Sequence, residues 1–127
     1  MIVVDTSALV AIVLDESDAE RCSLALRDAD RVMISAGTLV EALIVAARRG
    51  KSVEMTRLIE GLGLEVIAVG ASEARRAADA HARWRKGVHP AGLNFGDCLA
   101  YAVAEEHNCP LLFVGEDFAR TDVQVCP

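Results

Sequence analysis

The sequence has few aromatic residues and few basic ones. Aromatic residues make up 4% of the 127 residues, so the core has to be built mainly from Ala, Val, Leu and Ile. So few rings argue against a stacking platform for single-stranded nucleic acid, which needs exposed aromatic side chains. The formal net charge is −6, from 13 basic and 19 acidic residues, which argues against a non-specific binder of duplex nucleic acid.

Cysteine motifs and long hydrophobic runs are also absent. The four cysteines lie far apart with no CxxC or CxH spacing, which excludes the common zinc and redox motifs. We expect them to be small apolar fillers in a reduced protein. No apolar run approaches the roughly 20 residues that span a bilayer, and the N-terminus has no basic stretch before its first acid. These absences predict a cytoplasmic protein without a membrane partner.

Length and composition predict a single domain over residues 1–127. A hydrophobic fraction of 53% with 25% charged residues excludes intrinsic disorder. The length of 127 residues lies within the usual size of one domain, roughly 100–200 residues. A chain of this size buries enough surface for a core without disulfides or structural metals.

Short apolar runs alternate with helical periodicities along the whole chain. The expected strands cover residues 2–4, 32–35, 65–69 and 111–114, followed by a short edge strand at 123–125. The expected helices cover residues 8–14, 17–29, 38–48, 72–86 and a buried stretch at 98–104, with one more from 52 to 61 or 63. This alternation predicts an α/β fold with a mainly parallel sheet and helices on both faces. Ligands of such sheets bind beyond the carboxyl ends of the strands.

Four acids fall near those strand ends. Asp5 ends the first strand, Asp97 opens the buried helix, Asp117 follows the fourth strand, and Glu41 lies among apolar neighbours in the helix after the second strand. Each has a local alternative: a helix cap for Asp5, a complement to the helix dipole for Asp97, a turn for Asp117 and a solvent-facing stripe for Glu41. Because all four fall near the same edge, we expect them to converge on one site.

Such a cluster of carboxylates is costly when it holds no cation. Two like charges 4 Å apart repel by about 4 kcal/mol at an effective dielectric of 20, so the acids either keep protons or hold cations. An all-oxygen set without His or Cys favours Mg²⁺ or Mn²⁺ over zinc. Such ions grip phosphate oxygens and activate water, so the predicted chemistry is hydrolysis of a phosphodiester or phosphomonoester.

Four segments together carry a resemblance to a known family. Residues 4–9 (VDTSAL), 35–41 (SAGTLVE), 89–98 (HPAGLNFGDC) and 111–118 (LLFVGEDF) resemble the PIN-domain ribonucleases, and among them the VapC toxins of type II toxin–antitoxin systems. The resemblance covers nearly the whole chain. It implies a PIN-like three-layer α/β/α fold with a central, mainly parallel sheet of four to five strands. It also implies an endoribonuclease that uses Mg²⁺ or Mn²⁺ to hydrolyse RNA and is restrained by a cognate VapB-type antitoxin.

The same resemblance implies roles for individual residues. The acids that match the catalytic and metal-binding positions of the family are Asp5, Glu41, Asp97 and Asp117. Ser7 would support the site by hydrogen bonding, and Asn94 would orient the loop before Asp97. Whether the site holds one ion or two stays open.

One motif departs from the family pattern. Relatives often carry Lys-Gly-Asp-Asp-Phe where this chain has residues 114–118 (VGEDF), so Val114 replaces the basic residue. Glu116 thereby competes with Asp117 for the fourth acidic position.

The sequence leaves three further questions open. The densest basic region is either a phosphate-binding surface or a set of solvated helix faces, and it comprises Arg75, Arg76, Arg83, Arg85, Lys86 and His89. The apolar stretches 8–14 and 39–47 either pack in the core or offer faces to an antitoxin helix and a second subunit. The alternative functions are a PIN-like partner-binding domain and a Mg²⁺-dependent phosphatase or phosphotransfer domain with little nuclease activity.

Overall fold

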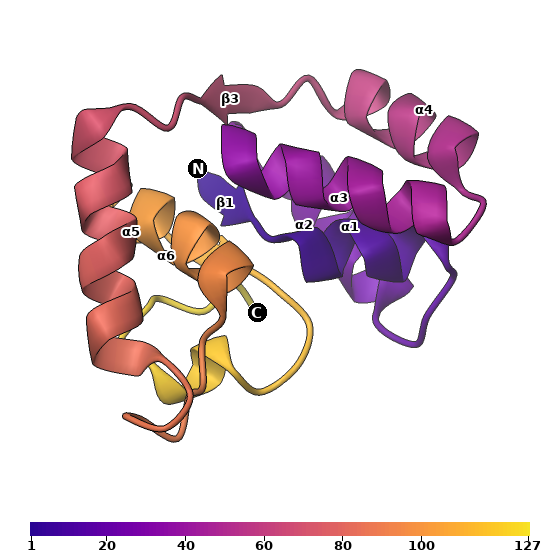
Figure 1. Ribbon diagram of the computed structural model, residues 1–127. Helices are drawn as coiled ribbons and strands as arrows, with labels where there is room; N and C mark the ends of the chain where they lie inside the picture. The colour runs from indigo at the N-terminus through magenta and orange to yellow at the C-terminus, as the bar shows by residue number, and fades with distance from the viewer.

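The computed structural model describes residues 1–127 and contains a four-stranded parallel sheet flanked by six helices (Figure 1). The strand order is β3-β2-β1-β4, and the strands are β1 (Ile2–Val4), β2 (Val32–Ser35), β3 (Glu65–Ile67) and β4 (Leu111–Leu112). The helices are α1 (Thr6–Val13), α2 (Ala19–Asp28), α3 (Ala36–Arg48), α4 (Ser52–Leu62), α5 (Ala71–Trp84) and α6 (Phe95–His107), followed by a short 3₁₀ helix, η1 (Phe118–Arg120). The predicted α/β fold is confirmed.

Residues of the strands alternate between two helical layers. Val3, Met33 and Leu111 pack with α5 and α6 on one face of the sheet. Their neighbours Val4 and Leu112 pack with α1, α2, α3 and α4 on the other face. Figure 1 shows α5 and α6 grouped apart from these four helices. The period of two along each strand therefore builds two cores, one on each side of the sheet.

Helix α6 is the central helix that the apolar run predicted. Its buried residues include Cys98 and the whole stretch 100–104. The helix leads into β4, and β4 runs parallel to β1. The first turn of α6 therefore lies at the carboxyl edge of the sheet, where ligands of such folds bind.

Two strands are shorter than the sequence predicts. β3 ends at Ile67 and is an edge strand with an exposed Val66, so it lacks the second neighbour that would extend it. β4 ends at Leu112 because side chains form hydrogen bonds with the next backbone groups. The Phe113 carbonyl accepts a hydrogen bond from Arg21 at 3.1 Å, and the Val114 N–H donates to Ser7 Oγ at 3.0 Å.

The C-terminal edge strand expected at 123–125 is reduced to one bridge. Val125 pairs in parallel with Leu111, and the pairing does not extend beyond this single bridge. All four cysteines are unpaired, and Cys22, Cys98 and Cys109 are buried as the filler interpretation predicts. No helix has the length and apolar character needed to cross a membrane.

Candidate active site

Asp5 lies at the carboxyl end of β1 and caps α1. Its Oδ2 accepts hydrogen bonds from the Ser7 backbone N–H at 3.0 Å and from Ser7 Oγ at 2.6 Å. Ser7 Oγ in turn accepts the Val114 N–H, so one hydroxyl joins the end of β1 to the segment that follows β4. The cap and the cluster were alternatives for Asp5 in the sequence, and the structure shows that one carboxylate oxygen makes the cap.

The second oxygen of Asp5 has no such partner. Asp5 is 4% exposed, and its Oδ1 is buried without a hydrogen bond. Burial raises the pKa of Asp5, the Ser7 hydrogen bonds lower it, and the charge of Glu41 raises it again. A buried carboxylate oxygen that lacks a donor is costly, which makes Oδ1 the atom of this site that most needs a ligand.

Glu41 reaches the site from α3 and is half-buried. Thr6 Oγ1 donates a 2.6 Å hydrogen bond to Glu41 Oε1, and the Thr38 carbonyl oxygen lies 3.2 Å from the same hydroxyl. The carboxylate packs against Gly96 in the first turn of α6: a Cβ built on Gly96 would lie 2.9 Å from Glu41 Cδ and 3.1 Å from Oε1. The solvent-facing alternative for Glu41 is therefore wrong.

Asp97 and Asn94 hold the first turn of α6 through reciprocal hydrogen bonds. Asn94 Oδ1 accepts the Asp97 N–H at 2.9 Å, and Asp97 Oδ2 accepts the Asn94 N–H at 3.0 Å. This capping box fixes the direction of the Asp97 side chain. The pKa of Asp97 is raised to about 6: burial raises it most, the Asn94 hydrogen bond lowers it, and the charges of Asp5, Asp117 and Glu41 raise it.

The acids after β4 face different surroundings. Asp117 is exposed at the start of η1, and its charge is among those that raise the pKa of Asp97. Glu116 lines a separate depression of about 380 Å³ together with Asp18, Arg21 and Cys126. This geometry favours Asp117 over Glu116 as the fourth acid of the cluster.

Asp97 lies within electrostatic reach of Asp5, Asp117 and Glu41, and Asp5 within reach of Glu41. No three His, Cys, Asp or Glu side chains are arranged as a ready set of metal ligands, and one oxygen each of Asp5, Glu41 and Asp97 accepts hydrogen bonds from the protein. The site nevertheless fits a hard divalent cation on two counts. Its donors are all carboxylate oxygens, and Asp5 Oδ1 is buried without a partner.

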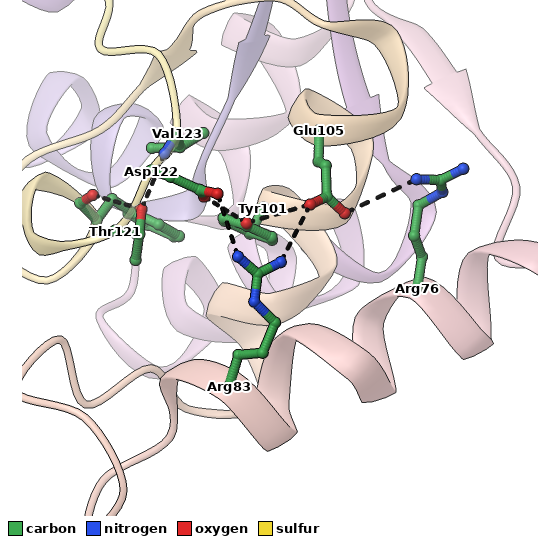
Figure 2. Close-up of polar contacts among 8 residues, drawn as sticks. Arg76, Arg83, Tyr101, Glu105, Thr121, Asp122 and Val123 are labelled. Atoms are coloured by element: carbon green, nitrogen blue, oxygen red, sulfur yellow. Dashed lines mark hydrogen bonds and ion pairs between the residues drawn. The ribbon is translucent and has the colours of Figure 1, made fainter.

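Two basic side chains on α5, those of Arg76 and Arg83, form ion pairs with acids. Figure 2 shows Arg83 between Glu105 and Asp122, at 3.5 Å and 3.2 Å, and Arg76 reaching Glu105 at 3.7 Å. Tyr101 completes this network by donating a 2.5 Å hydrogen bond to Asp122. Arg76 and Arg83 are therefore not the free phosphate-binding surface that the sequence left open.

Two residues of the site were not singled out from the sequence. Thr6 lies within the first motif without an assigned role, yet its hydroxyl donates to Glu41, which lies 35 residues away. Gly96 was part of the motif without a role, yet it makes the space that the Glu41 carboxylate fills. A glycine inside the first turn of an otherwise buried helix was the available signal, because glycine costs helix stability unless the space is needed.

The PIN-domain family model matches residues 2–124. This chain belongs to the PIN-domain family. It is 44% identical over 124 residues to ribonuclease VapC30 of Mycobacterium tuberculosis, with 95% of each chain covered. At this level of similarity the chain is a PIN-domain protein of the VapC ribonuclease family, as the motif resemblance predicts.

Solved structures agree on the fold. The chain superposes on the crystal structure of Mycobacterium tuberculosis VapC20, described as a sarcin-ricin loop cleaving toxin, with a TM-score of 0.79, 20% identity and 100% of both chains covered. A toxin–antitoxin complex from Klebsiella pneumoniae matches with a TM-score of 0.75 and 20% identity, over 100% of this chain and 98% of that one. The PIN-like three-layer α/β/α fold is thus common to this chain and to both structures.

Proposed function

We propose that this VapC-type chain cleaves RNA endonucleolytically and that its ribonuclease activity depends on Mg²⁺ or Mn²⁺. The proposed catalytic and metal-binding acids are Asp5, Glu41, Asp97 and Asp117. The observation that carries the proposal is the buried Asp5 Oδ1 without a partner, next to acids whose charges raise the pKa of Asp97. A bound divalent cation supplies charge neutralisation, a grip on phosphate oxygens and an activated water.

The other residues of the site hold these acids in place. Ser7 fixes one oxygen of Asp5 and leaves the other free, and Thr6 fixes one oxygen of Glu41. Asn94 fixes Asp97 through the capping box. Hydrogen-bonding partners of metal-binding side chains orient them and tune their affinity, and their loss typically costs about 10- to 100-fold in metal affinity or activity.

We propose a VapB-type antitoxin as a partner, and a homodimer as the assembly of the toxin itself. The supporting surface is a stripe on α3, which we call the α3 stripe: Val40, Leu43 and Ile44 are 55%, 41% and 47% exposed. Their spacing places them on one side of the helix, where an uncovered apolar face fits a helix of a partner. Residues 8–14 mainly pack in the core: Ala8, Leu9 and Ala11 are buried, and Val10, Ile12 and Val13 are partly buried against the same core.

We propose a cytoplasmic location for this protein. The unpaired cysteines and an RNA substrate both suit a reducing, RNA-rich compartment.

The metal dependence is tested by incubating the protein with total RNA in EDTA and after adding back Mg²⁺ or Mn²⁺. We expect cleavage only with the added ion, and none for Asp97→Asn. Cleavage that continues in excess EDTA contradicts the metal proposal. The partner is tested by co-expressing the product of the small adjacent gene, which should bind the toxin and block cleavage. An active monomer that is indifferent to this product contradicts the toxin–antitoxin proposal.

A further inference from the structure

Phe95 is the one aromatic residue whose ring is left uncovered. Its side chain is 78% exposed, whereas Tyr101, Phe113 and Phe118 are at most 7% exposed. Trp84, the remaining aromatic residue, packs against the core on the α5 and α6 side. Of the five aromatic side chains, four pack in or against the core and one is exposed at the surface.

The residue that carries the uncovered ring adjoins the acid cluster along α6. Phe95 is the first residue of α6, next to Gly96, against which the Glu41 carboxylate packs, and two residues before Asp97. Successive helical residues point about 100° apart, so Phe95 and Asp97 leave α6 in different directions, and Gly96, which contacts Glu41, lies between them in the chain.

The backbone that carries the ring is fixed. The capping box of Asn94 and Asp97 closes the turn, and the buried Leu93 donates its N–H to the Trp84 carbonyl at 2.9 Å. Because this backbone is already ordered, only the side-chain torsions of Phe95 lose freedom when a planar group lies on the ring, which favours binding.

The overall charge of this chain does not favour RNA binding. The net charge is −6, and the guanidinium groups of Arg76 and Arg83 are paired with Glu105 and Asp122 (Figure 2). A stacked base contributes affinity without any positive charge, because every base presents a π face.

We propose that Phe95 stacks on a base of single-stranded RNA beside the phosphodiester that the acid cluster attacks. The inference deepens the proposed function and rests on it. The low aromatic content excludes a platform of several rings, and one ring serves one base. The ring reads no hydrogen-bonding edge, so it sets affinity and position on the strand rather than base identity.

The test compares Phe95→Leu, which keeps apolar bulk without a ring, with Phe95→Trp, which keeps a ring. The substrate is a single-stranded RNA randomised at every position. For Phe95→Leu we expect the apparent KM to rise by about 5- to 150-fold, the range that corresponds to one lost stacked base, with kcat unchanged. Phe95→Trp should retain the wild-type KM. Val53→Ala, at an exposed apolar residue of α4, is the matched control and should also retain it.

A second readout needs no cleavage. In EDTA, the added fluorescence of Phe95→Trp over the wild type should be quenched by the RNA, and not by an abasic oligomer of equal length and charge. Equal quenching by both oligomers, or a wild-type KM for Phe95→Leu, overturns the proposal. A wild-type KM together with lost dimerisation or lost antitoxin binding assigns the ring to a protein contact instead. If the wild type cleaves no RNA with Mg²⁺, the proposed function fails, while base-dependent quenching still supports the stacking contact.

Discussion

The carboxylate of Glu41 occupies the space in which a side chain on residue 96 would begin. A Cβ at that position would lie 2.9 Å from Glu41 Cδ, and the first turn of α6 cannot retreat because the capping box of Asn94 and Asp97 holds it. Two acids that come from different helices are therefore brought together by the absence of a side chain between them.

Gly96→Ala should separate activity from stability. The methyl group would push the Glu41 carboxylate away from the cluster, and we expect activity to fall by about 10- to 100-fold, as for other residues that orient metal-binding groups. Alanine is the better helix former by about 1 kcal/mol, which offsets part of the steric cost, so the variant should stay folded. The measurements are kcat/KM at saturating Mg²⁺ and urea unfolding.

Gly61→Ala is the control for this change. Gly61 lies in α4 with nothing within 4 Å of a built Cβ, so alanine there should raise stability by up to ~1 kcal/mol without changing activity. Full activity of Gly96→Ala would mean that the position of Glu41 does not matter for catalysis.

Thr6→Val tests the hydrogen bond that holds Glu41. The substitution keeps the shape of the side chain and removes the hydroxyl that donates to Glu41 Oε1 at 2.6 Å. We expect about 0.5–1.5 kcal/mol lower stability from the lost hydrogen bond and about 10- to 100-fold weaker activity. Thr6→Ser should restore both. A Mg²⁺ titration of activity is the decisive measurement, since a hydroxyl that serves only the packing of α1 against α3 leaves the Mg²⁺ requirement unchanged.

The sequence predicted the order of the elements because its apolar runs are short and its helices are periodic. It misplaced the ends of β3 and β4, since these depend on neighbours that are remote in the chain. β4 ends where the Val114 N–H donates a hydrogen bond to Ser7 Oγ, and the local sequence at Leu111 to Val114 does not indicate that contact.

The site also combines features that are local in the sequence with contacts between residues that are remote in the chain. Asp5 and Asp97 follow from the strand ends and the helix start, which are local features. The roles of Thr6 and Gly96 arise only when α1, α3 and α6 pack together, because each acts on Glu41. Local patterns therefore locate the acids, and the tertiary packing decides what holds them.

The stability of the metal-free protein should fall as pH rises from about 4 to about 6. Burial, and then the charges of Asp5, Asp117 and Glu41, raise the pKa of Asp97 from 3.8 to about 6. In this window the folded state binds a proton that the unfolded state has released, so the free energy of unfolding decreases with pH. The raised pKa of Asp5 acts in the same direction.

Urea unfolding in EDTA at several pH values checks this. Asp30 and Asp122 have lowered pKa values and act in the opposite direction at lower pH. The difference in the free energy of unfolding between the wild type and Asp97→Asn therefore isolates the contribution of Asp97. Asp97→Asn should remove most of the decline. A wild-type stability that rises through this window relative to the variant would contradict the crowding of acids around Asp97.

Asp5→Asn should make the metal-free protein more stable and the enzyme inactive. An amide oxygen in place of Oδ2 can accept the same two hydrogen bonds from Ser7, so the cap of α1 is kept. The buried charge disappears, and with it the repulsion from Glu41, for which about 4 kcal/mol at 4 Å and a dielectric of 20 is the upper bound. Asp5→Ala loses the cap as well and should be about 0.5–2 kcal/mol less stable than Asp5→Asn.

Mg²⁺ should reverse the order of wild type and Asp5→Asn, because a ligand stabilises the state that binds it and the wild type binds Mg²⁺ more tightly. The measurement is a set of thermal melts of both proteins in EDTA and in Mg²⁺, with RNA cleavage followed in parallel. If Asp5→Asn melts clearly below the wild type in EDTA, then Asp5 acts chiefly as the cap of α1, and its unpartnered Oδ1 is not the sign of a metal site.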